Sequence, residues 1–272
     1  MTDVRAGDRS PEQDESSPPT PRNYPVAVRQ QPEQQAPPVQ RLRIRYAKRG
    51  RLRFTSHRDF SRAFERAVAR ARIPVALSSG FNPHPRISYA GAAPTGAASE
   101  AEYLELALRD RVDPGDAWRA LDEVMPDGLD LLEVVDAADA PPGALADLLQ
   151  ASSWIIDLPT PTDQAAAAVA TFLAAPEVLV ERMTKKGLRQ FDCRAAVVTL
   201  SAVPRAGGTR LELLLMHGTP AVRPDDVVTG LQVLAGLQVG PEYGGLPLLT
   251  RLSQGPFDEA TATIADPLHR TS

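Results

Sequence analysis

The sequence predicts an α+β protein built from two tandem ferredoxin-like modules, each a split βαβ unit. Segments that alternate apolar and polar residues, the period of a strand, are interspersed with segments of helical periodicity. In the first half their order is strand–helix–strand–strand–helix–strand, which is the order of a split βαβ unit. The second half repeats this order with one extra strand. A chain of 272 residues is long enough for two such modules.

The predicted organisation has four parts. Residues 1–40 contain eight of the 26 prolines and six glutamines with little apolar periodicity, so we expect a disordered tail. Residues 41–140 form a basic first module, and residues 150–257 form the second. Residues 258–272 are weakly patterned and predict a frayed C-terminal tail.

The first module opens with a strand, because Arg41–Tyr46 (RLRIRY) alternates basic and apolar residues. A helix follows Ser56, whose spacing to Asp59 fits a capping box, and it ends before Pro74. Its apolar residues recur at helical spacing, and its arginines face elsewhere. The later elements are strands at 86–89, 101–108 and 129–135 and a helix that starts at Asp113.

The second module begins with a strand at 154–158 and an alanine-rich helix at 162–174. Two strands, 177–183 and 195–202, flank the segment KKGLRQFD, which predicts a turn. The simplest interpretation of Lys185-Lys186-Gly187 is a hairpin turn, and its charge can extend the basic surface of the first module. The last elements are a strand at 210–217, a helix at 224–237 and a closing strand at 246–253.

Composition excludes several classes of site. The single cysteine, Cys193, rules out an internal disulfide, a CxxC pair and a self-contained iron–sulfur cluster. The four histidines show no metal-binding spacing, so we expect neither a metal nor a cofactor. No apolar run approaches the ~20 residues of a membrane span, and the N-terminus is polar. The sequence therefore predicts a soluble, cytoplasmic protein with no membrane partner.

The net charge of −4 is distributed unevenly along the chain. From Arg41 to Arg72 there are twelve basic residues and two acidic ones, a local charge of 12 − 2 = +10, which leaves −4 − 10 = −14 for the remainder. This asymmetry predicts one basic surface on an acidic body. Of the 30 basic residues 27 are arginine, which reflects coding bias, so the clustering and not the residue type is the evidence.

The basic cluster supplies the candidate nucleic-acid-binding residues. If the alternation holds, the arginines of the first strand share one face, opposite the core, where they can contact a phosphate backbone. The alternative is a solvated face at the edge of the sheet. The strand lacks the aromatic RNP pattern of sequence-reading RNA-binding domains. The candidates are Arg41, Arg43, Arg45, Arg49, Arg51, Arg53, Arg58 and Arg86.

Two histidines are candidate catalytic residues. His57 lies in the first turn of a helix, where it can act in acid–base chemistry or contact phosphate, or merely form local hydrogen bonds. His84 lies between two prolines in a rigid loop, a typical presentation of a functional side chain, although the loop can also be a structural turn. The candidate loop residues are Gly80, Phe81, Asn82, Pro83, His84 and Pro85.

Three segments resemble the radical-SAM-linked protein family. Ser56–Asp59 (SHRD), Arg62–Ala67 (RAFERA) and Ser78–Ser88 (SSGFNPHPRIS) match its patterns S-H-x-D, R-A-x-x-R-A and S-x-G-F-N-P-H-P-x-I-S. Lys186–Asp192 (KGLRQFD) is similar to a further family pattern. The resemblance covers about residues 41–253. It implies a member without the radical-SAM domain, since the chain lacks that domain's Cx3Cx2C motif, and it implies no catalytic residues.

These observations predict an RNA-binding or accessory protein in RNA metabolism or modification. The resemblance implies association with a radical-SAM protein, or with RNA-degradation or ribosome-assembly factors. Two alternatives stay open. One is a metal-independent RNA endonuclease that uses His57 or His84 as acid or base, and the other is a protein-docking module that does not bind RNA.

Overall fold

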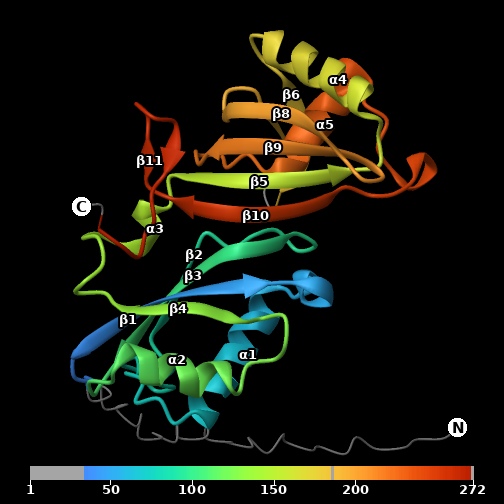
Figure 1. Cartoon of the computed structure of the whole chain (residues 1–272). Helices are drawn as coiled ribbons and strands as arrows, with labels where there is room; N and C mark the ends of the chain where they lie inside the picture. Colours follow the sequence, from blue (N-terminus) through green and yellow to red (C-terminus); the bar gives the residue numbers. More distant parts are fainter. Residues whose placement is uncertain (1–33, 185–186, 271–272) are drawn as a thin grey trace, which may run out of the picture.

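A computed structural model describes residues 34–184 and 187–270 of the chain (Figure 1). It is a mixed α/β structure around a mostly antiparallel eight-stranded sheet, with the strand order β4-β1-β3-β10-β5-β9-β8 and β2 paired to β3. Most of the predicted N-terminal tail and the predicted turn residues Lys185 and Lys186 lie outside the described residues. No helix in the described part of the chain is long and apolar enough to cross a membrane.

The first half has the predicted order of elements. Its strands lie in the order β4-β1-β3-β2, and every neighbouring pair is antiparallel. The elements are β1 (Gln40–Lys48), the 3-10 helix η1 (Gly50–Phe54), α1 (His57–Arg70), β2 (Ile87–Ala90), β3 (Ala98–Leu108), α2 (Pro114–Asp122) and β4 (Leu131–Asp136).

The second half repeats this arrangement, with the order β10-β5-β9-β8 and a separate β6–β7 hairpin. The short helix α3 (Leu145–Leu148) precedes it. Its elements are β5 (Ala151–Leu158), α4 (Thr162–Ala174), β6 (Leu179–Thr184), β7 (Gly187–Asp192), β8 (Val197–Arg205), β9 (Gly208–Met216), α5 (Pro224–Ala235), η2 (Pro241–Tyr243) and β10 (Leu248–Gly255).

Each half has its own core. In the first, Leu42 and Ile44 of β1 are fully buried against Phe60 and Phe64 of α1, and the Phe60 ring stacks on Tyr46 at 4.2 Å. Fully burying one such side chain contributes about 1.5–3 kcal/mol. The second core gathers residues of β5, β8 and β9 under α4 and α5. These helices lie at the opposite end of the molecule from α1 and α2 (Figure 1).

The segment KKGLRQFD differs from the turn that its polarity predicts. Its described part, Gly187–Asp192, is strand β7, which pairs with β6 in register from Leu179↔Asp192 to Thr184↔Gly187. Phe191 is the buried anchor of this strand, and the Arg182 guanidinium lies 4.5 Å from its ring centroid. One buried residue among exposed neighbours gives no period-2 signal, so the pattern missed the strand.

The C-terminal segment also differs from the frayed tail predicted for residues 258–272. Residues 257–264 form the hairpin β11 (Phe257–Asp258) and β12 (Thr263–Ile264), and the segment then packs on the first half. Leu268 is fully buried with Tyr103 and the helix α3. Arg270 donates to the backbone carbonyls of Ala138 and Ala140 at 2.9 and 3.1 Å. Only Pro267 and Leu268 are buried within residues 258–270, which is too few for a periodic signal.

The two halves meet where β10 pairs with β3 in parallel. Arg251 of β10 is buried there and donates to Ser99 Oγ at 3.2 Å, to Gln254 Oε1 at 3.1 Å and to the Glu102 carboxylate. Its guanidinium also lies 5.4 Å from the Trp154 ring centroid. A buried charge is tolerated when it is paired and hydrogen-bonded, so this polar cluster fixes how the halves join.

Candidate nucleic-acid interface

Arg43 of β1 is a structural residue and not part of a free basic face. It is 3% exposed, and it donates to the backbone carbonyls of Pro141 and Gly143 at 2.7 and 2.6 Å. Its Nε lies 3.4 Å from the Glu105 carboxylate. The segment between the two halves therefore covers the sheet face where the alternation predicts a phosphate contact. Arg43 can reach a phosphate only if the segment that contains Pro141 and Gly143 moves away from the sheet.

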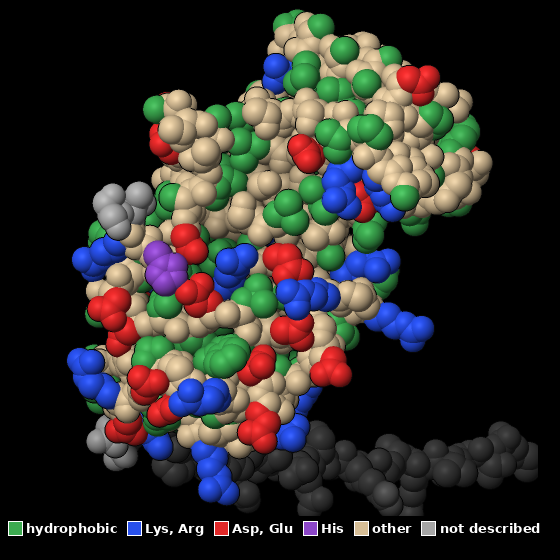
Figure 2. All heavy atoms as spheres, in the orientation of Figure 1, with side chains coloured by type: hydrophobic (Ala, Val, Ile, Leu, Met, Phe, Trp, Pro, Cys, Tyr) green, Lys and Arg blue, Asp and Glu red, His purple; other side chains and the backbone are tan. Residues whose placement is uncertain are grey.

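The neighbouring arginines are also engaged. Arg41 pairs with Glu105 at 2.7 Å, and Arg45 donates to the backbone carbonyl of Glu100 at 2.8 Å. Arg49 forms an ion pair with the Glu100 side chain, and that hydrogen bond raises the pKa of the guanidinium. Acidic and basic side chains accordingly intermingle over the lower half of the molecule in Figure 2. Much of the positive charge of β1 is balanced locally.

Arg53, one of the two predicted arginines of η1, lies over an exposed ring. Arg51 is exposed, and the Arg53 guanidinium lies 4.5 Å from the centroid of the Phe54 ring, which is 59% exposed. Arg53 also donates to the backbone carbonyl of Gly50 at 3.3 Å. An exposed aromatic ring next to a guanidinium is the combination that single-stranded nucleic acids contact by stacking and by phosphate pairing.

The free positive charge of the first half lies on α1. Four exposed arginines recur every fourth residue, which places them along one side of a helix. Within the described ranges none of the four side chains forms a hydrogen bond or an ion pair. Only Arg58 is among the predicted site residues, and the spacing of four was the signal for the others. We call this set the α1 arginine surface: Arg58, Arg62, Arg66 and Arg70.

His57 begins α1, as predicted, and its side chain is exposed. Ser56 is the N-cap of α1: its Oγ accepts from the backbone N–H of Asp59 at 3.2 Å and donates to the Asp59 carboxylate at 2.7 Å, in place of the Ser56 N–H bond that completes a capping box. The His57 ring contacts the edge of the Tyr89 ring, with centroids 4.9 Å apart. Burial raises the pKa of Tyr89 to about 12, so its hydroxyl stays protonated at neutral pH.

The loop of residues 78–86 is closed at its base. The Ser78 N–H donates to the His84 carbonyl at 2.8 Å, and the His84 N–H donates to Ser78 Oγ at 3.0 Å. Gly80 has a φ of +133°, which favours glycine, and Phe81 is 65% exposed. Asn82, Pro83 and the His84 side chain are exposed, and Pro85 is half-buried.

The structure does not join the two histidines in one acid–base arrangement. Arg86 is exposed, and its backbone N–H donates to the Ala76 carbonyl at 2.9 Å. Among the described residues no hydrogen bond links the ring of His57 or His84 to the other ring, to Arg86 or to a carboxylate. A general base needs a group that orients it, and among residues 34–184 and 187–270 no hydrogen-bonded group orients either ring.

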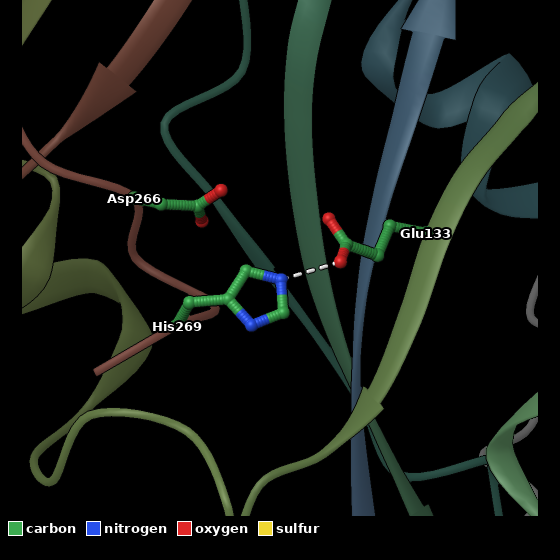
Figure 3. Close-up of side chains that lie close together, drawn as sticks. All are labelled: Glu133, Asp266 and His269. Atoms are coloured by element: carbon green, nitrogen blue, oxygen red, sulfur yellow. Dashed lines mark hydrogen bonds and ion pairs between the residues drawn. The ribbon is translucent and has the colours of Figure 1, made fainter. Parts of the chain in front are cut away.

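One cluster has the side chains to hold a cation. Oxygen and nitrogen atoms of Glu133, Asp266 and His269 lie within 4.8 Å of one another (Figure 3). His269 Nε2 is bonded to Glu133 Oε1 at 2.5 Å, which raises the pKa of the imidazole, and Asp266 accepts from the Leu268 N–H at 2.8 Å. These bonds connect the C-terminal segment to β4, a structural role.

Cys193 is buried, and burial raises the pKa of its thiol to about 12. The thiolate is the nucleophilic form of cysteine. This residue therefore packs in the core of the second half as an inert side chain, in line with its lack of a local partner in the sequence.

Comparison with models of protein families matches residues 41–224 to DUF2344, described as an uncharacterized protein conserved in bacteria. The matched range contains β1 from its second residue on, the α1 arginine surface and the loop of residues 78–86. No curated protein matches the chain.

Proposed function

The chain belongs to the DUF2344 family of uncharacterized bacterial proteins, and we propose that it is an RNA-binding or accessory protein in RNA metabolism or modification. It holds RNA on the first half and presents it to a separate enzyme. The family description names no activity, so the proposal rests on the chemistry of the surface.

The observation that carries the proposal is the α1 arginine surface. Four exposed guanidinium groups on one helix, free of local acidic partners within the described residues, attract a polyanion. Arg51, Arg72 and Arg86 are exposed as well and belong to the same half. Phosphate binding releases counterions from the nucleic acid, which supplies affinity without a sequence requirement. The exposed rings of Phe54 and Phe81 offer stacking surfaces that suit unpaired RNA bases.

We further propose a fold for each half and an identity for the enzyme partner. Each half is a ferredoxin-like module, which is supported by the shared order of fourth, first, third and second strand in both. The enzyme partner is a radical-SAM protein or a component of the RNA-processing machinery. This partner rests on the resemblance of the segments around His57 and His84 to the radical-SAM-linked family.

The test is a titration of a fluorescently labelled single-stranded RNA with the full chain at rising salt. We expect the affinity to fall steeply between about 50 and 200 mM salt, because several phosphates are neutralised. Absence of binding, or an affinity that does not change with salt, contradicts the proposal. A pulldown from lysate that survives nuclease treatment, together with absence of RNA binding, assigns the surface to an acidic protein partner instead.

A further inference from the structure

A cavity of about 490 Å³ lies between the two halves, next to the start of α1. We propose that it receives one base of a bound single-stranded RNA and favours bases that carry an exocyclic amino group. This inference rests on the proposed function. The volume is within the range of about 300–1,000 Å³ that is typical of ligand sites. The lining of the cavity includes Arg53, Phe54, Asp225, Thr229, Gln232 and Leu248.

The first half supplies a stacking wall. The Phe54 ring lines the cavity and is 59% exposed, although phenylalanine side chains are usually buried. The Arg53 guanidinium lies over one face of the ring, 4.5 Å from its centroid, so a base would stack on the other face. A base that stacks on Phe54 would place its phosphate within the field of Arg53. Base–aromatic stacking of this kind tolerates every base, since each has a π-face.

The second half supplies a hydrogen-bonding wall. Asp225, in the first turn of α5, is exposed, and its carboxylate accepts no hydrogen bond from any residue of the described ranges. By contrast, Thr229 already donates to the Asp225 carbonyl at 2.9 Å, and Gln232 donates to the Val239 carbonyl at 3.1 Å. The Asp225 carboxylate is therefore a charged acceptor at the cavity that has no hydrogen-bond partner among the described residues.

The carboxylate decides which part of the RNA enters. A phosphate is repelled by Asp225 and gains nothing from apolar neighbours such as Leu248, whereas a base is planar and mostly apolar on its faces. A carboxylate accepts from exocyclic amino groups, as in aspartate or glutamate contacts to cytosine N4. Adenine, cytosine and guanine carry such a group, and uracil does not. The cavity therefore favours these bases over uracil.

The cavity and the α1 arginine surface are connected along the chain. Phe54 is followed by Thr55 and the N-cap Ser56, and Arg58 lies in the first turn of α1. A strand of RNA whose phosphates contact α1 thus reaches the cavity at the N-terminal end of the helix. This continuity favours a nucleotide of the same RNA as the occupant over an unrelated small molecule.

The experiment compares ten-nucleotide rA, rC and rU with the wild-type chain and the variants Phe54→Ala, Asp225→Ala and Leu188→Ala. Leu188 is an equally exposed apolar residue of the β6–β7 hairpin and serves as the matched control. We expect Phe54→Ala to weaken binding of rA and rC by about 5- to 100-fold. We expect Asp225→Ala to remove the preference for rA and rC over rU, and Leu188→Ala to change nothing.

The outcomes separate this inference from the proposed function. If the wild-type chain binds RNA in a salt-dependent way and neither Phe54→Ala nor Asp225→Ala changes affinity or base preference, the base site is wrong and the RNA-binding proposal stands. If the wild-type chain binds no RNA, both fail. Thermal unfolding of each variant shows whether it is folded, and 2-aminopurine placed in the RNA gives a second readout. Its fluorescence should be quenched by the wild-type chain and not by Phe54→Ala.

Discussion

The two halves of the molecule share one strand order but expose different surfaces. In the first half, the sheet face opposite α1 and α2 is covered by the segment between the halves and by the C-terminal segment. In the second half, the face opposite α4 and α5 is hollowed by a groove of about 400 Å³ that Thr199 and Glu212 help to line. The first half therefore exposes its helices, and the second half exposes a hollowed sheet face as well.

The arginines of strand β1 and those of helix α1 have different roles. On β1 the arginines hydrogen-bond to carbonyls and carboxylates that fold back over the sheet, so they stabilise the fold. On α1 the arginines project from a helix with few acidic neighbours and remain available. The same local charge of +10 thus divides into a structural part and a part that can bind a partner.

Removing the buried charge at the junction should have the largest effect. Glu102→Ala leaves Arg251 buried without its carboxylate, and it removes the acceptor for the Ala93 N–H. We expect a loss of about 3–5 kcal/mol in the free energy of unfolding, measured by urea denaturation. An unchanged midpoint would mean that the halves do not depend on this polar cluster.

The comparison between β1 and α1 predicts opposite results for two arginines. Arg43→Ala leaves the carbonyls of Pro141 and Gly143 without their charged donor and should cost about 2–3 kcal/mol of stability. Arg62→Ala removes an exposed side chain and should change stability by less than about 0.5 kcal/mol. Equal effects of the two substitutions would contradict the division into structural and available arginines.

The stability of the junction should depend on pH through His217. Its Nδ1–H donates to the Leu149 carbonyl at 2.7 Å, and Nε2 lies 2.8 Å from Ser152 Oγ. Burial lowers the pKa of His217 below its usual 6.5, so the neutral ring stabilises the fold above that pH. This contribution is lost as the pH falls from about 6.5 through the lowered pKa. His217→Asn should be less stable at pH 7.5 and should lose less stability on acidification than the wild type.

The smallest expected effect concerns the contact between the C-terminal segment and β4. The Glu133 hydrogen bond raises the pKa of His269, so the pair is fully formed below about 6.5 and is lost as the pH rises through the raised pKa. His269→Ala should leave global stability within about 0.5 kcal/mol, because the pair is largely exposed. Faster amide hydrogen exchange of residues 266–270, relative to the wild type at pH 6, would confirm the local role. Unchanged exchange would contradict it.

Much of the fold follows from the sequence, because each half has strong local periodicity. The alternation of β1, the N-cap Ser56 and the spacing of Phe60 and Phe64 predict β1 and α1, whereas the 3-10 helix η1 between them was not predicted. The parts that were missed depend on partners distant in the sequence. Arg43 is buried by carbonyls about 100 residues away, and Arg251 pairs with Glu102 across 149 residues. Periodicity reports which face is apolar, but it does not report what covers the other face.

The salt dependence of RNA affinity in two variants tests the central claim most directly. The triple variant Arg58→Gln, Arg62→Gln, Arg66→Gln removes three charges from the α1 arginine surface, and Arg41→Gln removes a paired charge from β1. For single-stranded RNA each lost phosphate contact should lower the slope of log affinity against log salt by about 0.7. We predict a decrease of about 2 for the triple variant and little change for Arg41→Gln. An unchanged slope in the triple variant, or a large decrease for Arg41→Gln alone, would contradict the assignment of RNA binding to α1.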